Sequence, residues 1–299
     1  MHHEASRADS CVLPVRQLFL DALPDSLRQI TEPPAHLYTD GPLLLDNQPR
    51  IAMVGSRSAS WQGLHYAEQI AAQVAALGLV IVSGLARGID AACHRGALSV
   101  GGATIAVLGQ GCDVIYPKEN AALHHQIALK GLLVSEYAPG TQPRGYHFPA
   151  RNRVITGLCD ALIVIEAKQR SGSLISARWA LEQGKEVFAV PGSVGQGASS
   201  GCHELIREGA YLFETVADLF AVLPQLLPRD ASKPTKGPMP SGNLSPLHET
   251  ICDLLSSGPL FAGTLFEALD VSMQALMAAL HQLESDGKIH RHQGAYYLQ

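Results

Sequence analysis

The stretch Ile51-Ala-Met-Val-Gly-Ser-Arg57 places four apolar residues directly before a glycine, a hydroxyl group and a guanidinium group. Five further short apolar runs, rich in Val and Ile, follow at 79–82, 104–108, 132–134, 161–165 and 186–190. Such runs are typical of parallel strands that are buried on both faces. Segments with helical spacing of apolar residues separate them, for example 63–77. The pattern predicts an α/β fold built on an extended Rossmann-like, mostly parallel, doubly wound sheet.

The composition predicts four parts within the 299 residues. Residues 1–49 contain six prolines and predict an N-terminal stub, a short helix followed by an extended lead-in. Residues 50–227 form the Rossmann-like domain, and 228–246 have the Pro, Ser, Lys and Gly content of a linker. Residues 247–299 predict helices at 248–256, 262–269 and 272–285 and a terminal hairpin, which favours a small α+β winged-helix domain.

Charge and cysteine content narrow the function. The formal net charge is -5, so any affinity for DNA must come from a local concentration of Lys and Arg. The six cysteines are scattered without a CxxC pair, so we expect a reduced cytoplasmic protein without a metal site. The sequence shows neither a signal peptide nor an apolar run long enough for a membrane span.

The segments that follow the predicted strands are almost all rich in Gly and Ser. They are 55–60, 83–88, 109–113, 136–140, 166–173 and 191–193. Because ligands of parallel sheets bind outside the carboxyl ends of the strands, these segments should converge on one edge. Backbone N–H groups, hydroxyls and Arg side chains there would bind anions, so the sequence predicts an extended anionic ligand.

The common nucleotide and catalytic motifs are missing from the sequence. Gly55 stands alone where GxGxxG needs three glycines, and no GxxxxGK[ST] occurs. Gly197 to Gly201 matches GxSxG, but it follows its strand by several residues and forms no strand-to-helix elbow. His94, near Asp90, is more simply a hydrogen-bonded helix residue than part of a triad. We therefore expect no catalytic residue and no cofactor.

The densest basic segment is 144–178, and it interleaves cations with aromatic rings. Its cations are Arg144, Arg151, Arg153, Lys168, Arg170 and Arg178, and its rings include Tyr146, His147 and Phe148. Cations beside flat rings suit the phosphates and unstacked bases of a single strand. For several of these residues a structural role stays open beside a DNA contact. Arg151 and Arg153 could bind Glu166, and Phe148 could belong to the core. Lys168 and Arg170 could lie in a solvated loop, and Arg87 could pair with Asp90.

Ordered motifs over roughly residues 30–220 resemble the DNA-processing protein A (DprA/Smf) family. They are Asp40-Gly41, Val54–Arg57, Ser83–His94, Tyr116–Asn120, Phe148–Ile155, Glu166–Leu174 and Val187–Gly192. The resemblance implies single-stranded DNA binding, a homodimer, and protection of incoming DNA with loading of RecA recombinase during natural transformation. It also implies that the protein is not an enzyme.

The resemblance assigns three contacts in this sequence. Arg57 matches a phosphate-contacting arginine, Lys118 a DNA-binding lysine, and Phe148 an aromatic residue that packs on a base. Gly145 stands near the place of a basic residue that is frequent in the family, and Arg144 is the candidate to replace it. The full predicted DNA-binding set is Gly55, Ser56, Arg57, Lys118, Arg144, Phe148, Arg151, Arg153, Lys168, Arg170, Ser171 and Gly172.

The predicted winged-helix domain is a poor candidate for DNA binding. Its segment 272–285, which would be the recognition helix, contains no Lys or Arg, and acids outnumber bases across the domain. Helices that enter a groove need charge that neutralises phosphates, so we expect weak or no DNA binding and a role in protein contacts. Two rival functions for the whole protein stay open. One is a nucleotide hydrolase on a related sheet, and the other is a protein adaptor in which the winged helix dominates.

Overall fold

The structure is a computed structural model with two compact units, Met1–Ala231 and Ser232–Gln299. It describes residues 15–43, 45, 48–194, 197–226, 246–256, 258, 260, 261, 264, 265, 268, 269, 271, 276, 279, 280, 282–284, 286–292 and 295–298. The predicted linker, 228–246, therefore lies outside the described residues except for its last residue. Each unit is described by itself below.

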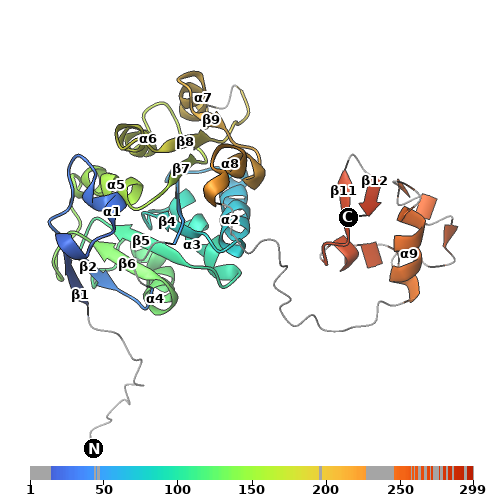
Figure 1. Ribbon diagram of the computed structural model, residues 1–299, viewed down its shortest axis with the longest axis horizontal. Helices are drawn as coiled ribbons and strands as arrows, with labels where there is room; N and C mark the ends of the chain where they lie inside the picture. The colour runs from blue at the N-terminus through green and yellow to red at the C-terminus, as the bar shows by residue number, and fades with distance from the viewer. Residues whose placement is uncertain are drawn as a thin grey trace, which may run out of the picture. The chain divides into compact units, whose positions relative to one another are not determined.

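The first unit is built on one nine-stranded sheet (Figure 1). Its strands are β1 (Arg16–Phe19), β2 (His36–Asp40), β3 (Arg50–Val54), β4 (Val80–Ser83), β5 (Thr104–Leu108), β6 (Leu132–Ser135), β7 (Ala161–Val164), β8 (Glu186–Ala189) and β9 (Tyr211–Leu212). The spatial order is β1-β2-β6-β5-β4-β3-β7-β8-β9. All pairs from β6 to β9 are parallel. The six predicted apolar runs coincide with β3 to β8 to within one residue at each end, which confirms the mostly parallel sheet.

Helices cover both faces of this sheet (Figure 1). They are α1 (Asp25–Arg28), α2 (Trp61–Ala76), α3 (Ile89–Ser99), α4 (Ala121–Lys130), α5 (His147–Gly157), α6 (Ser173–Glu182), α7 (Ser200–Arg207) and α8 (Val216–Val222), with 3-10 turns at Leu20–Ala22, Lys118–Asn120 and Pro224–Leu226. Ala52 and Val54 of β3 join the core under α5, α6 and α7, whereas Ile51 and Met53 join the core under α2, α3 and α8. Because both faces of β3 are buried, the strand is apolar from Ile51 to Val54, after the buried Arg50.

The segment before residue 50 contributes more than the predicted lead-in. β2 pairs antiparallel with β6, and β1 pairs antiparallel with β2, so two strands extend the sheet at this edge. Leu37 of β2 is fully buried, but the strand alternates buried and half-buried residues, and β1 is mostly exposed. Without a continuous apolar run, these strands carry no signal of the kind that reveals β3 to β8.

The strand order changes direction at β3. The chain proceeds outward through β4, β5 and β6, and then returns to the other side of β3 with β7, β8 and β9. The carboxyl ends of β3 and β7 therefore flank a topological switch point, where ligands of doubly wound sheets bind. The loops that leave these two strands, 55–60 and 165–172, carry the Gly, Ser and basic residues singled out in the sequence.

The second unit contains α9 (Pro246–Ser256) and a small antiparallel sheet of order β10-β12-β11. Its strands are β10 (Leu260–Phe261), β11 (Ile289–His292) and β12 (Ala295–Leu298). Ile251, Leu276, Leu280 and Leu283 lie in its core. The helix at 248–256 and the terminal hairpin are confirmed, whereas parts of the predicted helices 262–269 and 272–285 lie outside the described residues. Across the described chain, no helix is long and apolar enough to cross a membrane.

Candidate nucleic-acid interface

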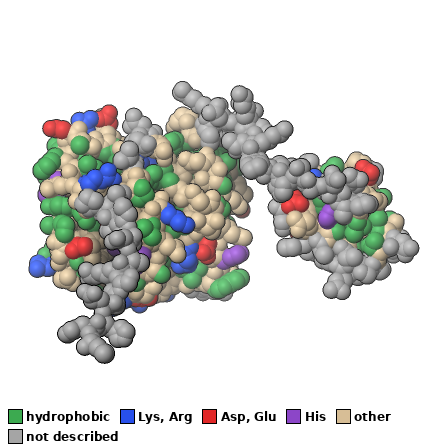
Figure 2. All heavy atoms as spheres, turned by 90° about the horizontal axis from the view of Figure 1, so that it is seen from below, with side chains coloured by type: hydrophobic (Ala, Val, Ile, Leu, Met, Phe, Trp, Pro, Cys, Tyr) green, Lys and Arg blue, Asp and Glu red, His purple; other side chains and the backbone are tan. Residues whose placement is uncertain are grey.

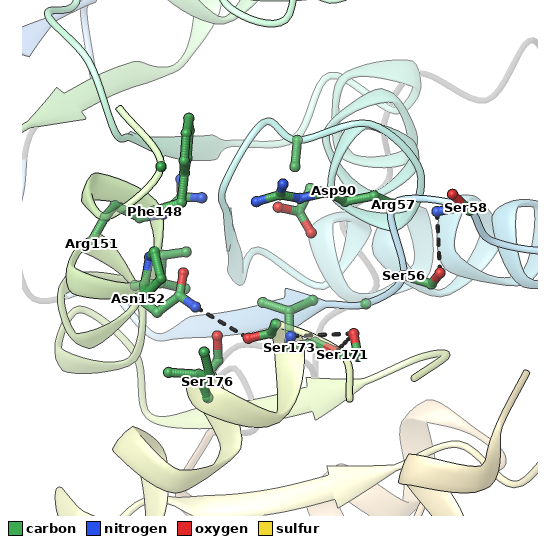
Figure 3. A pocket seen from close by; sticks show the side chains of 18 of the residues that line it. Ser56, Arg57, Ser58, Asp90, Phe148, Arg151, Asn152, Ser171, Ser173 and Ser176 are labelled. Atoms are coloured by element: carbon green, nitrogen blue, oxygen red, sulfur yellow. Dashed lines mark hydrogen bonds between the residues drawn. The ribbon is translucent and has the colours of Figure 1, made fainter. Parts of the chain in front are cut away.

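A cleft of about 740 Å³ opens at the carboxyl ends of β3 and β7 (Figure 3). We call it the first cleft. Most of its lining residues come from three segments, 54–58, 143–155 and 168–176, and Ala86, Asp90 and Tyr116 complete it. Ten of the twelve predicted DNA-binding residues line it: Gly55, Ser56, Arg57, Arg144, Phe148, Arg151, Lys168, Arg170, Ser171 and Gly172.

A cation and an aromatic ring meet across the first cleft. The guanidinium carbon of exposed Arg57 lies 5.4 Å from the centre of the Phe148 ring. Phe148 is half-buried and also packs against Tyr116, with ring centres 5.5 Å apart and a 34° tilt. Phe148 therefore belongs to the wall of the cleft, and the alternative of a core residue does not hold. The pair offers a phosphate partner beside a stacking surface.

The loop after β3 is pressed tightly against α3. The backbone N–H of Ser56 donates to the carbonyl of Glu166 at 2.7 Å, and the Ser56 hydroxyl accepts from the N–H of Ser58 at 3.2 Å. A Cβ on Gly55 would lie 2.6 Å from a side-chain carbon of Ile89. Glycine is required there because the backbone runs so close to its neighbour.

The opposite wall is the beginning of α6. The hydroxyls of Ser171 and Ser173 lie 2.7 Å apart, and the Asn152 amide donates to the Gly172 carbonyl at 3.4 Å (Figure 3). The first-turn N–H groups of this ten-residue helix form the positive end of its dipole. Exposed Lys168 and Arg170 precede it on the same loop. This wall can bind an anion through backbone, hydroxyl and cationic groups together.

The first cleft concentrates positive charge on an acidic chain. Five of its lining residues are Lys or Arg, and Asp90 is the single acid among the described residues that line it. On the face that Figure 2 shows, Lys and Arg side chains are scattered among acidic and uncharged ones. The predicted local concentration of cations therefore exists at this edge of the sheet, despite the net charge of -5.

Arg151 lies beneath the first cleft with only 4% of its surface exposed. Its guanidinium donates to the carbonyl of Gly84 at 2.8 Å and to that of Val107, at the ends of two strands. Burial lowers the pKa of Arg151 to about 10, and the charge of nearby Asp90 opposes that shift. This geometry favours a structural role for Arg151 over a surface contact with DNA. Arg151 fixes its own segment to the sheet through the carbonyls of Gly84 and Val107, and not through Glu166.

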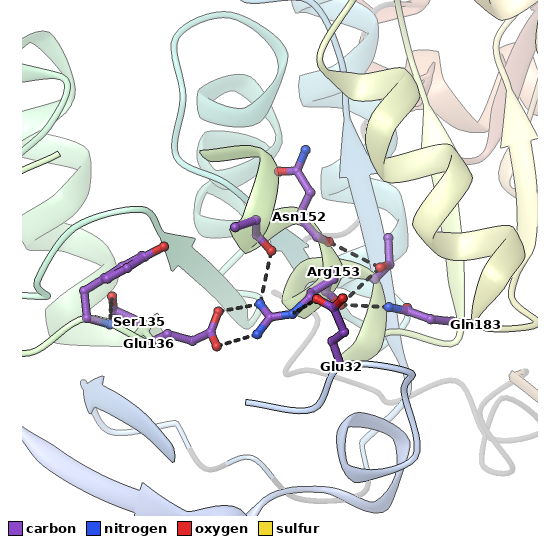
Figure 4. A network of polar contacts seen from close by, with 9 residues as sticks. Glu32, Ser135, Glu136, Asn152, Arg153 and Gln183 are labelled. Atoms are coloured by element: carbon purple, nitrogen blue, oxygen red, sulfur yellow. Dashed lines mark hydrogen bonds and ion pairs between the residues drawn. The ribbon is translucent and has the colours of Figure 1, made fainter. Parts of the chain in front are cut away.

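Arg153 is not among the residues that line the first cleft, and its guanidinium points toward Glu136 and Glu32 (Figure 4). Two of its N–H groups bind the two carboxylate oxygens of Glu136 at 2.5 and 2.6 Å, and Glu32 lies 3.8 Å from its Nε. The side chain is 12% exposed. Both its hydrogen bonds and its charge are therefore engaged inside the protein, which favours a structural role over a DNA contact. The partner is Glu136 and not Glu166, which the sequence suggested.

Lys118 is exposed but does not line the first cleft. Its neighbour Glu119 forms an ion pair with Arg87 at 3.3 Å, so Arg87 is paired with Glu119 and not, as in the alternative left open above, with Asp90. Tyr116, two residues before Lys118, does line the cleft. It was missed as a site residue, although an aromatic residue so close to a predicted DNA-binding lysine was a usable signal.

Asp90 also lines the first cleft, although it was not assigned to the site from the sequence. It stands in the first turn of α3, nearly buried, and beside Arg57 in the floor of the cleft (Figure 3). Burial raises its pKa, while Arg151, the backbone N–H of Ala86 and Arg57 oppose that shift. A carboxylate in this place attracts the Arg57 side chain and disfavours phosphates at the floor, so anions are expected at the rim.

Comparison with known proteins agrees with this geometry. Residues 18–224 match the family of DNA recombination-mediator protein A, and residues 235–295 match the DprA winged helix domain. The DNA processing protein DprA of Streptococcus pneumoniae is 51% identical over 201 residues, which are 67% of this chain and 71% of that protein. Protein Smf of Escherichia coli is 45% identical over 63% of this chain, a match that spans 51% of its own length.

Solved structures show the same fold. DNA processing protein A from Streptococcus pneumoniae superposes with a TM-score of 0.67 and 48% identity, over 70% of this chain and 74% of that chain. DNA processing protein A from Helicobacter pylori, whose structure was described for its single-stranded DNA binding mode, superposes with a TM-score of 0.65 and 31% identity. That match covers 71% of this chain and 96% of the Helicobacter pylori chain. The motifs, the sheet topology and these matches agree, and the chain belongs to the DNA recombination-mediator protein A family.

Proposed function

We propose that this protein binds single-stranded DNA in the first cleft, without reading its sequence. The observation that carries the proposal is the juxtaposition of Arg57 with Phe148 at the switch point of the sheet. A single strand exposes charged phosphates and flat bases at regular intervals, and this pair presents one partner for each. Binding of that strand by the Helicobacter pylori relative supports the same assignment here.

Different groups of the first cleft would bind the phosphates and the bases of the strand. Phosphates would bind the serine hydroxyl groups of 56–58 and 171–173, with Arg57, Lys168 and Arg170 supplying charge. A base would stack on Phe148, whose ring every base can use because each has an aromatic face. Contacts with phosphates and ring faces carry no sequence information, which suits a protein that accepts any incoming strand.

We further propose that the protein protects incoming DNA and loads RecA recombinase onto it during natural transformation, in the cytoplasm and as a homodimer. Membership of a family of recombination mediators supports this role, as do relatives that are DNA processing proteins. The proposal assigns the protein no catalytic step. The winged-helix part, poor in cations, is proposed to serve protein contacts.

Titrations of the full chain test the first proposal. The ligands are labelled oligo-dT, a duplex of equal length and nucleoside monophosphates. We expect tight, salt-sensitive binding of the single strand and weaker binding of the duplex. Tight binding and turnover of a monophosphate would instead favour a nucleotide hydrolase. Absence of binding to all three ligands would favour an adaptor protein.

RecA loading is tested by the rate at which RecA filaments form on single strands, with and without this protein. We expect the wild-type chain to shorten the lag before filament growth and Arg57→Ala, which should bind DNA poorly, to shorten it much less. If the protein binds the oligonucleotide but does not change the lag, the proposal of DNA binding stands and the proposal of RecA loading is wrong.

A further inference from the structure

A second cleft, of about 730 Å³, opens at the same carboxyl edge of the sheet. It lies at the start of α2, between the ends of β7 and β8 and residues 213–214. Ser56 and Ser58 line the first cleft, whereas Ser60 and Trp61 line the second, so the loop 56–60 separates the two. The proposed function makes no use of this second cleft.

Trp61 gives the second cleft a flat, exposed aromatic surface. The side chain is 76% exposed, although an indole is among the largest apolar groups that a protein can bury. His65, one turn later on α2, stacks on it with ring centres 5.4 Å apart and planes 9° from parallel. This stacking holds one face of the indole in place while the rest of the ring stays open to a ligand.

The polarity of the second cleft suits an uncharged ring and not a phosphate. No Lys or Arg occurs among the described residues that line it. The charged residues among those that line it are two acids, Glu166, whose carboxylate binds Ser60, and Glu214, so a phosphate is disfavoured there. The amides of Gln62 and Gln69 can donate to or accept from the edge of a base. The first cleft, with five cations, offers the opposite environment.

Glu166 fixes the ridge between the two clefts. Its backbone carbonyl accepts from Ser56 N–H at 2.7 Å, and its carboxylate accepts from the N–H of Ser60 at 3.1 Å and from the Ser60 hydroxyl at 2.5 Å. The loop is therefore clamped at both ends by one residue. The Cα atoms of Arg57 and Trp61, four residues apart, lie at most about 14 Å from each other.

We propose that the second cleft is a base-stacking subsite for the same strand that occupies the first cleft. A nucleobase stacks on Trp61 after the strand crosses the ridge at 56–60, while Arg57 and the first cleft hold the phosphates. This inference rests on the proposed function and extends it, because it sets the direction of the strand across the sheet edge and the minimum length that fills the site.

Tryptophan fluorescence tests the subsite directly. Trp61 and Trp179 are the two tryptophans of the chain, so Trp179→Phe leaves Trp61 as the reporter. Oligo-dT of about 4 nucleotides should fill the first cleft alone, whereas about 12 nucleotides should reach both clefts. We expect the long oligonucleotide to quench Trp61 emission and the short one to leave it nearly unchanged.

Affinities provide a second measurement. Trp61→Ala should weaken binding of the long oligonucleotide by about 5- to 150-fold, the range for one base stacked on an aromatic residue. Trp61→Phe should recover most of that loss, and affinity for the short oligonucleotide should not change in either variant. Leu129→Ala is the matched control, because Leu129 is 60% exposed near the end of α4, just before β6 begins at the opposite edge of the sheet.

The outcomes separate this inference from the proposed function. If the long oligonucleotide binds and Arg57→Ala weakens it, but Trp61 emission and the affinity of Trp61→Ala stay unchanged, the subsite is wrong and the first cleft stands. If the wild-type chain binds neither oligonucleotide, the proposed function is wrong and the subsite is wrong with it.

Discussion

The guanidinium of Arg57, at the end of β3, lies over the ring of Phe148, at the start of α5, with 5.4 Å between guanidinium carbon and ring centre. The two residues are far apart in sequence, and only the closure of the sheet around its switch point brings them together. An exposed cation–π contact contributes about 0.5–1 kcal/mol, so it is weak enough to open when a ligand competes for both partners. We infer that the pair is poised for a phosphate and a base.

Replacing Arg57 with Ala should remove about one phosphate contact. The slope of log affinity against log salt concentration should fall by roughly 0.7, because one fewer counterion is released from a single strand. Arg57→Lys should keep most of the slope. Affinity for oligo-dT at several salt concentrations measures this, with Arg178→Ala as the control, since Arg178 is exposed outside the first cleft. An equal loss of slope in Arg178→Ala would refute the assignment.

Phe148→Ala should weaken binding of oligo-dT by ~1–3 kcal/mol, the value of one stacked base, with little change in the salt slope. Phe148→Tyr should retain the stacking surface and most of the affinity. Fluorescence anisotropy of a labelled oligonucleotide gives both values. Tyr146→Ala is the control, because Tyr146 is a neighbouring exposed ring that does not line the first cleft.

Variants of Arg151 and Lys168 should have different effects, one on the stability of the fold and the other on DNA binding. Arg151→Ala leaves the buried carbonyls of Gly84 and Val107 without their donor, which should lower the free energy of unfolding by about 2–5 kcal/mol. Lys168→Ala removes an exposed cation of the cleft, so it should weaken DNA binding and leave the free energy of unfolding nearly unchanged. Urea unfolding and oligo-dT titration of both variants check this; a stable Arg151→Ala that binds DNA poorly would make Arg151 a direct contact.

His94 should make the protein less stable in acid. It is fully buried, its Nδ1 lies 2.7 Å from the Thr104 hydroxyl, and burial lowers its pKa from 6.5 to about 3. Between these pH values the unfolded chain binds a proton that the folded chain does not. The stabilisation is therefore complete above pH 6.5 and decreases toward pH 3, by up to about 1.4 kcal/mol per pH unit.

Guanidinium unfolding at several pH values measures that dependence. His94→Gln should flatten it over the same range, whereas His65→Gln, which changes an exposed histidine, should leave it as in the wild type. Equal slopes in the wild type and His94→Gln would contradict the assignment to His94.

Gly88 should tolerate no side chain. Its φ is +78°, and a Cβ there would lie 2.2 Å from the carbonyl oxygen of Ser56. Gly101 has a similar φ of +70° but open space around the same position. Gly101→Ala should therefore cost about 1–2 kcal/mol from backbone strain alone. Gly88→Ala should lower the free energy of unfolding further and, by displacing the loop after β3, weaken DNA binding; equal effects in the two variants would exclude the clash.

Much of the fold follows from the sequence because burial on both faces leaves an unmistakable pattern. β3 to β8 are nearly continuous apolar runs, and parallel strands share one carboxyl edge, so the loops at 55–60 and 166–173 had to meet. β1 and β2 are partly exposed, and β9 has two residues that are both exposed. Their stability comes from pairing with distant strands, which local periodicity does not report.

The loops and residue types of the site can be predicted from the amino-acid sequence, since the ordered motifs include Arg57, Phe148 and the Lys168 segment. Which cations reach the site depends on the folded chain. Arg151 and Arg153 stand two positions apart on α5, where helix geometry turns their side chains to different sides. The carbonyls of Gly84, just after β4, and of Val107 in β5 accept from Arg151, and Glu136 binds Arg153. A basic residue binds whichever acceptor the fold brings to it, and folding alone supplies acceptors from distant parts of the chain.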